Sequence, residues 1–225
     1  MTRAIILLSG GMDSLVCAAT AVAECDEAYF LHFSYGQRTQ KKELACFNSL
    51  VQHYQPKAAK VVDYQCLSEI GGSALTDPSW AIQPNASSAI PNTYVPFRNA
   101  LLLCAAVAWA EVIDASSIYI GAVEEDSSGY PDCRSVFFQA FNQVISTGSV
   151  AGESIKIVTP VIDKSKAEIV KLGMQLRAPF QLSWSCYASD EEACGVCDSC
   201  RLRLKAFSEA GLQDPITYKV GRLEG

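Results

Sequence analysis

The sequence predicts an α/β fold with a doubly wound parallel sheet and a small metal-binding element at its C-terminal end. Short runs of consecutive apolar residues alternate with longer amphipathic segments along most of the chain. Such runs are typical of strands buried on both faces, and their alternation with helices is typical of a parallel sheet covered on both sides. Four cysteines within residues 186–200 predict the metal element. We therefore expect a sheet domain at residues 1–182 and a helical, metal-binding element at residues 183–225.

The apolar periodicity places five strands and five helices in the first domain. Strands are expected at residues 4–8, 28–33, 59–63, 117–123 and 155–161. Helices are expected at residues 13–23, 41–54, 99–113, 135–145 and 165–176. Residues 66–96 are rich in Gly and Pro, and we expect a mobile lid there because long irregular loops in compact domains are usually functional or disordered. Since ligands bind at the carboxyl ends of parallel strands, the site residues should follow those ends.

The composition argues against a nucleic-acid partner and against a membrane span. The net charge is -6, whereas a protein that binds a large polyanion needs clustered Lys and Arg. The longest apolar run, residues 101–110, is far shorter than the roughly 20 residues that a membrane span requires. Residues 4–8 form too short an apolar run for a signal peptide. We expect a soluble, cytoplasmic protein.

Residues 9–14, Ser-Gly-Gly-Met-Asp-Ser, join the first expected strand to the first helix. Paired glycines let a backbone approach a ligand closely, and a helix start offers unpaired N–H groups to an anion. Asp13 would repel a bare phosphate, so we expect it to act through Mg²⁺. The Walker pattern is absent, and the segment resembles the pyrophosphate loop of the ATP pyrophosphatase superfamily, which cleaves ATP between its α and β phosphates. A tight turn with Asp13 as the helix N-cap is the structural alternative.

The cysteine cluster has the spacing of a closed zinc site. Four thiolates complete a tetrahedral shell and leave no position for water, so one structural zinc per chain is expected at Cys186, Cys194, Cys197 and Cys200. A redox Cys-x-x-Cys pair and an iron–sulfur cluster are the alternatives. Three cations follow the cluster and are expected to offset the negative charge of the thiolates: Arg201, Arg203 and Lys205.

Polar residues that follow later strands are further candidates for the site. Arg98 can clamp phosphate or carboxylate oxygens with its planar fork, or form a surface salt bridge. Ser128, Tyr130 and Asp132 follow the expected strand at residues 117–123 and suit the hydrogen-bonding edge and the flat face of a guanine-like ring, unless the segment is only an acidic surface loop. Lys166 can neutralise transferred phosphates or be solvated.

The order of these segments resembles the 7-cyano-7-deazaguanine synthase (QueC) family of the queuosine pathway. The resemblance covers nearly the whole chain and rests on residues 9–14, 35–38, 95–99, 128–134, 159–168 and 185–200. Val161 stands where the family pattern has leucine, a conservative exchange. The resemblance implies a ligase that makes 7-cyano-7-deazaguanine from 7-carboxy-7-deazaguanine, ammonia and ATP through adenylated intermediates. It also implies a homodimer.

Carried over by position, the resemblance assigns roles to the candidate residues. ATP with Mg²⁺ would be bound by Leu8, Ser9, Gly10, Gly11, Met12, Asp13, Ser14, Leu15, Arg98 and Lys166. The deazaguanine would be bound by Ser128, Tyr130 and Asp132. Free ammonia is the expected nitrogen donor, because no glutamine-hydrolysing domain fits in 225 residues.

Two other classes of function remain open at this point. One is another pyrophosphatase-loop enzyme, such as a tRNA-modifying thiolase or an NAD synthetase-like amidase. A thiolase should have a basic RNA-binding face, and the acidic balance of the chain counts against it. The other is a non-enzymatic zinc module, against which the nucleotide loop argues.

Overall fold

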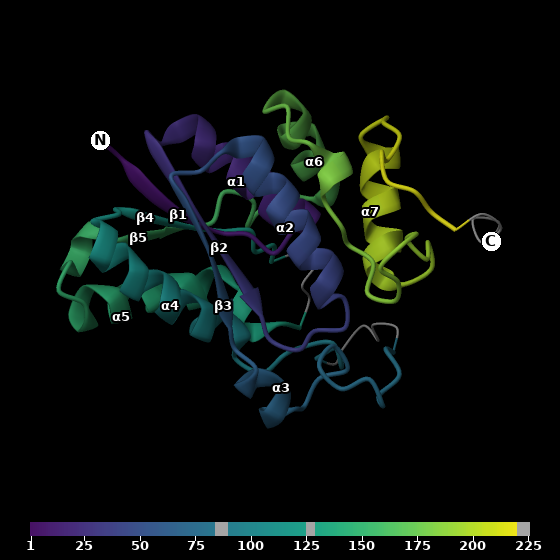
Figure 1. Ribbon diagram of the computed structural model, residues 1–225, viewed down its shortest axis with the longest axis horizontal. Helices are drawn as coiled ribbons and strands as arrows, with labels where there is room; N and C mark the ends of the chain where they lie inside the picture. Colours follow the sequence, from purple (N-terminus) through teal and green to yellow (C-terminus); the bar gives the residue numbers. More distant parts are fainter. Residues whose placement is uncertain (84–89, 125–128, 220–225) are drawn as a thin grey trace.

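The computed structural model describes residues 1–83, 90–124 and 129–219. Its centre is a five-stranded sheet in the order β3-β2-β1-β4-β5, in which every neighbouring pair is parallel. The strands are β1 Arg3–Leu7, β2 Glu27–Ser34, β3 Ala58–Asp63, β4 Ser117–Ile120 and β5 Lys156–Val158. Helices cover both faces (Figure 1). The predicted doubly wound α/β fold is confirmed.

Seven α-helices are present in the described residues. They are α1 Met12–Glu24, α2 Gln40–Tyr54, α3 Cys66–Ile70, α4 Arg98–Ile113, α5 Ser135–Gly148, α6 Lys166–Gln175 and α7 Asp198–Glu209. Three short 3-10 helices lie at Pro131–Cys133, Gly152–Ser154 and Phe180–Leu182. In Figure 1, α1, α2 and α6 lie on one side of the sheet, with α4 and α5 on the other. Within the described part of the chain, no helix has both the length and the apolar character needed to cross a membrane.

Alternate side chains of the central strand β1 enter two separate cores. Ile5 and Leu7 pack in the core that contains Leu103 of α4, whereas Ile6 packs in the core that contains Val16 of α1. Ile5, Ile6, Leu103 and Val16 are fully buried, and each such side chain contributes about 1.5–3 kcal/mol by leaving water. The consecutive apolar residues of β1 are therefore explained by burial on both faces of the sheet.

Three local predictions differ from the structure. The two last strands end at Ile120 and Val158, earlier than the expected residues 123 and 161. Gly121 directly follows β4. A Cβ at this position would lie 2.7 Å from the backbone nitrogen of Ser14, in the first turn of α1. The chain leaves the sheet at this close approach. Helix α3 lies in the segment expected to be irregular throughout, and residues 84–89 of that segment are outside the described part.

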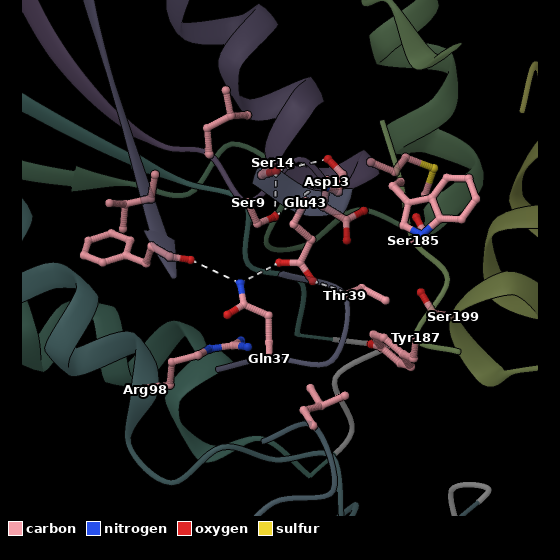
Figure 2. A pocket seen from close by; sticks show the side chains of 18 of the residues that line it. Ser9, Asp13, Ser14, Gln37, Thr39, Glu43, Arg98, Ser185, Tyr187 and Ser199 are labelled. Atoms are coloured by element: carbon pink, nitrogen blue, oxygen red, sulfur yellow. Dashed lines mark hydrogen bonds between the residues drawn. The ribbon is translucent and has the colours of Figure 1, made fainter. Parts of the chain in front are cut away.

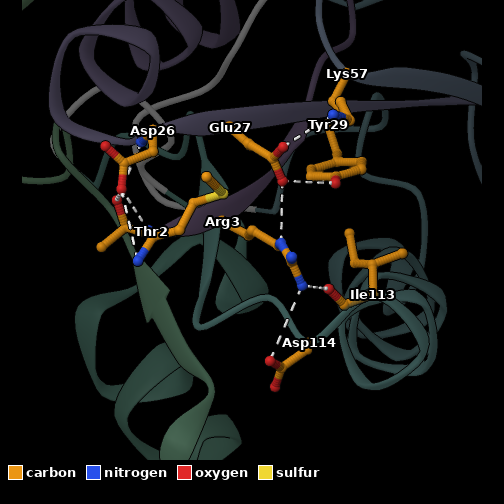
Figure 3. Close-up of polar contacts among 9 residues, drawn as sticks. Thr2, Arg3, Asp26, Glu27, Tyr29, Lys57, Ile113 and Asp114 are labelled. Atoms are coloured by element: carbon orange, nitrogen blue, oxygen red, sulfur yellow. Dashed lines mark hydrogen bonds and ion pairs between the residues drawn. The ribbon is translucent and has the colours of Figure 1, made fainter.

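A group of charged residues ties the strands together at the amino edge of the sheet, opposite the loops that follow the strands (Figure 3). Glu27 accepts hydrogen bonds from Arg3 Nε at 3.0 Å and from the Tyr29 hydroxyl at 3.1 Å. Its other oxygen pairs with Lys57 Nζ at 3.0 Å. Arg3 also donates to the carbonyl of Ile113, at the end of α4, at 2.8 Å. The hydrogen bond from Lys57, followed by those from Tyr29 and Arg3, lowers the pKa of Glu27 below its usual value.

The substitution Glu27→Gln should lower stability near neutral pH and have a smaller effect in acid. Because folding lowers the pKa of Glu27, the carboxylate stabilises the fold above its ordinary pKa of 4.5. This contribution is lost as the pH falls through the lowered value, since the carboxyl group is then protonated in both states. Urea unfolding of the unmodified protein and of Glu27→Gln, from neutral pH to about pH 3, measures this contribution to stability. A stability difference that stays constant over that range would contradict the assignment.

Candidate functional site

Residues 9–14 form a turn at the carboxyl end of β1 whose backbone is enclosed on three sides. Gly10 has a φ of +89°, and a Cβ there would lie 2.9 Å from the carbonyl oxygen of Glu43 in α2. The end of β4 approaches the turn at Gly121, as described above. On the third side, the Trp184 N–H donates to the Gly10 carbonyl at 2.8 Å. The turn is thus fixed by backbone contacts before any ligand binds.

The two serines of the turn face each other across it. Their hydroxyl oxygens, Ser9 Oγ and Ser14 Oγ, lie 2.9 Å apart. Ser14 Oγ donates to the Gly11 carbonyl at 3.0 Å, and Ser9 Oγ accepts from the Gly11 N–H at 3.2 Å. These bonds set the loop shape, and both hydroxyls line a cavity.

Asp13 and Lys166 form an ion pair at the first turn of α1. Lys166 Nζ lies 2.7 Å from Asp13 Oδ2, and the side chains are only 16% and 27% exposed. Lys166 is the first residue of α6, whose N-terminus is fixed by a capping box between Ser165 and Glu168. The other carboxylate oxygen, Asp13 Oδ1, is buried and has no hydrogen-bond partner in the described residues. The pair brings together two residues that are 153 positions apart.

Two cavities adjoin this turn. The first has a volume of about 280 Å³ and extends toward the end of β2, where Phe33 and Tyr35 line it. The second has a volume of about 220 Å³ and extends toward the end of β4 and Lys166. Eight residues line both cavities: Met12, Asp13, Arg98, Gly121, Tyr130, Ser185, Tyr187 and Ser199. The residues shared by the two cavities define what we call the junction.

The predicted nucleotide residues occupy different places around the turn. Of those at residues 8–15, six line the first cavity: Leu8, Ser9, Gly11, Met12, Asp13 and Ser14. Leu15 is fully buried in the core behind the turn. Gly10 lines neither of the two cavities and provides the close approach to α2.

Arg98 lies at the junction and makes no surface salt bridge in the described residues. Its guanidinium donates to the Tyr35 hydroxyl at 3.0 Å and lies 5.7 Å from the centre of the Tyr35 ring. Arg98 Nε is buried without a hydrogen-bond partner in the described part of the chain. A fixed cation with an unused buried donor is suited to bind an anionic oxygen.

Of the residues predicted to bind a heterocycle, Tyr130 lines the cavities and Asp132 does not. Tyr130 lines both cavities, and its hydroxyl lies 2.6 Å from Thr93 Oγ1. Burial raises the pKa of Tyr130 above its usual value. Asp132 lines neither cavity: it is 3% exposed, and its carboxylate accepts from the Asn99 N–H at 2.9 Å, in the first turn of α4. Ser128 lies outside the described residues.

The structure adds site residues that were not among the predicted binding residues. Glu43 lines the first cavity and is oriented by Gln37 Nε2 at 3.0 Å and Thr39 Oγ1 at 2.8 Å (Figure 2). Ser185, Tyr187 and Ser199 reach the junction from the C-terminal segment (Figure 2). In the sequence, each of these three residues directly adjoins a predicted cysteine ligand.

The four clustered cysteines fit a tetrahedral metal ion. Their sulfur atoms all lie within 4.8 Å of one another, and a metal–sulfur bond of about 2.3 Å places tetrahedral ligands roughly 3.8 Å apart. Backbone N–H groups of Ala188 and Cys194 donate to Cys186 Sγ at 3.4 Å, and that of Cys197 donates to Cys194 Sγ at 3.3 Å. Such bonds stabilise thiolates. The predicted metal-binding cluster is therefore assembled, with Cys200 as its fourth member.

Arg203 fastens the C-terminal segment to the sheet domain. Its guanidinium, 1% exposed, pairs with both oxygens of Asp214 at 2.7 and 3.0 Å. It also donates to Ser183 Oγ at 2.8 Å and to the Phe180 carbonyl at 3.1 Å. Asp214 is therefore the direct counter-charge of Arg203.

A family model described as queuosine biosynthesis protein QueC matches residues 3–211. The chain belongs to the QueC family. Proteins named 7-cyano-7-deazaguanine synthase from Chlorobaculum parvum and Chlorobaculum tepidum are 56% and 57% identical over 220 residues, which is 97% of this chain and of each relative. The predicted family and the prediction of an enzyme are confirmed. NMN synthetase from Francisella tularensis has a TM-score of 0.49 at 17% identity, over 94% of this chain and 78% of that one.

In this QueC-family chain, Asp214→Asn should strongly reduce stability. The substitution preserves shape but leaves the buried Arg203 guanidinium without its counter-charge, which costs about 3–5 kcal/mol. Chemical denaturation measures the loss. Glu209→Gln is the matched control: it breaks the exposed pair between Lys205 and Glu209 and should change stability by less than about 0.5 kcal/mol. Equal effects of the two substitutions would contradict the proposed anchor.

Proposed function

We propose that the chain converts 7-carboxy-7-deazaguanine and ammonia into 7-cyano-7-deazaguanine, at the expense of ATP, as a step of queuosine biosynthesis. One observation carries the proposal: Met12 and Asp13 of the turn line both cavities. A nucleotide in one cavity and an organic acid in the other would therefore meet at the turn. The proposal is also supported by the synthase name of relatives that match 97% of the chain.

On the nucleotide side, the turn would bind the phosphates. The backbone N–H groups at the start of α1 and the hydroxyls of Ser9 and Ser14 are the donors. The unpartnered Oδ1 of Asp13 is a suitable ligand for Mg²⁺, which would neutralise phosphate charge when bound. Lys166 and Arg98 would bind further phosphate oxygens, so Lys166 would exchange its pairing with Asp13 for one with the nucleotide.

The chemistry proceeds in two adenylations. A carboxylate oxygen of the acid attacks the α-phosphorus of ATP, and pyrophosphate leaves. Ammonia attacks the activated carbonyl carbon, and AMP leaves to give an amide after loss of a proton. The amide oxygen attacks the α-phosphorus of a second ATP, and a second pyrophosphate leaves. Loss of the two N–H protons and of AMP then forms the nitrile. The protein contributes position and fixed charge at each step.

Incubation of the protein with 7-carboxy-7-deazaguanine, ammonium and Mg-ATP tests this proposal by mass spectrometry. Nitrile and AMP should appear together, whereas formation of ADP in place of AMP, or no nitrile, would contradict it.

Asp13→Asn should lower kcat/KM by at least about 100-fold, because the proposed carboxylate ligand of Mg²⁺ at the phosphates is lost. The control Asp114→Asn changes a fully exposed carboxylate at the opposite edge of the sheet and should leave kcat/KM unchanged.

We further propose that the cysteine cluster holds one structural zinc ion and that residues 183–225 form an element appended to a domain at residues 1–182. Four thiolates close the coordination shell, so the ion would stabilise the fold without activating water. Ala206 and Phe207 of α7 are buried in the core that also contains Val16 of α1. The element therefore completes the core of the larger domain.

Cys197→Ser should remove the zinc and lower the melting temperature by at least about 10 °C, because metal binding is coupled to folding. Metal analysis and calorimetry measure both effects. Cys66→Ser changes an exposed cysteine outside the cluster and should retain zinc and stability. Iron in the purified protein, or full metal content in Cys197→Ser, would contradict the assignment.

We also propose a homodimer formed through the outer faces of α4 and α5. Apolar side chains are exposed along both helices, among them Val112 at 81%, Val136 at 65% and Val144 at 58%. Phe97, 60% exposed, packs edge-on against Phe137 of α5 and joins the two rows. Exposed apolar patches of this kind mark interaction surfaces. Light scattering should give twice the chain mass of 24.3 kDa; the mass of a single chain would contradict the proposal.

A further inference from the structure

The C-terminal element forms one wall of the junction. Asp13 and Arg98 reach the junction from the sheet domain, whereas Tyr187 and Ser199 reach it from the C-terminal element (Figure 2). Tyr130 of the sheet domain also lines both cavities. No cationic side chain of the C-terminal element is shared by the two cavities; what the element contributes there, within the described residues, is hydroxyl groups and backbone.

The positions of these hydroxyls are set by the cysteine cluster. Tyr187 directly follows Cys186, and Ser199 directly precedes Cys200, whose sulfur atoms lie within 4.8 Å of each other. Both side chains line the two cavities. The backbone N–H of Trp184, three residues before Tyr187, donates a hydrogen bond to the carbonyl of Gly10 in the turn. The hydroxyl pair is thus held at a fixed place relative to the turn.

We infer that the hydroxyl groups of Tyr187 and Ser199 bind the reacting carboxyl group of the organic acid at the junction and hold its oxygen toward the α-phosphorus. This inference rests on the proposed function. A hydroxyl both donates and accepts hydrogen bonds. The pair therefore suits the carboxylate, which only accepts, and the amide intermediate, which accepts through oxygen and donates through nitrogen. A lysine or arginine in this place could donate to either oxygen but could not accept from the amide N–H.

Steady-state kinetics of Tyr187→Phe and Ser199→Ala test the inference. Each substitution removes one hydrogen bond to a charged group, so kcat/KM for 7-carboxy-7-deazaguanine should fall about 10- to 100-fold. The KM for ATP should stay within about two-fold, because the turn and Arg98 are unchanged. Zinc content and melting temperature should match those of the unmodified protein. Tyr218→Phe is the control: its hydroxyl lies in the same element, 2.7 Å from Asp214, and lines neither cavity.

The outcomes separate this inference from the proposed function. If the unmodified protein forms no nitrile, the proposed function fails. If it turns over and both variants keep their kcat/KM for the acid, only the binding role of the hydroxyl pair is overturned. A parallel loss for ATP and acid, accompanied by loss of zinc, would also overturn it, because the residues would then support the fold alone. Calorimetric titration of the acid without ATP provides a second measurement and should show weakened binding in both variants.

Discussion

The backbone contacts around residues 9–14 are the constraint on which the rest of the site depends. The turn is so close to α2 and to the end of β4 that Gly10 and Gly121 leave no room for a side chain. The hydrogen bond from Trp184 to Gly10 then places the C-terminal segment directly against the turn. Because of this contact, side chains next to the cysteine cluster face the turn, although the two segments are far apart in sequence.

The charged groups of the site are placed to bind a ligand, and they lower the stability of the protein when no ligand is bound. Asp13 Oδ1 and Arg98 Nε are buried without partners in the described residues, and such groups lower stability until something binds them. The ion pair between Asp13 and Lys166 offsets part of that cost. Groups that already point at the place where charge develops need little reorganisation during the reaction.

Much of the fold and part of the site could be predicted from the sequence. Buried strands, amphipathic helices, the glycine turn and the cysteine spacing are local patterns, and each was found near its predicted place. What could not be predicted depends on contacts between distant segments. Asp132 caps α4 through Asn99, 33 residues away, and Arg203 pairs with Asp214 rather than with the thiolates. Tyr187 and Ser199 face the junction only because the cysteines fold around one point, which no local pattern of hydroxyl residues reveals.

A crystal structure with Mg²⁺ and α,β-methylene-ATP, in which the cleaved bond is replaced, tests the central claim most directly. The β and γ phosphates should lie on the backbone N–H groups of residues 10–14, with the α-phosphorus at the junction facing Tyr187. A nucleotide bound elsewhere while the turn holds no phosphate would contradict the account.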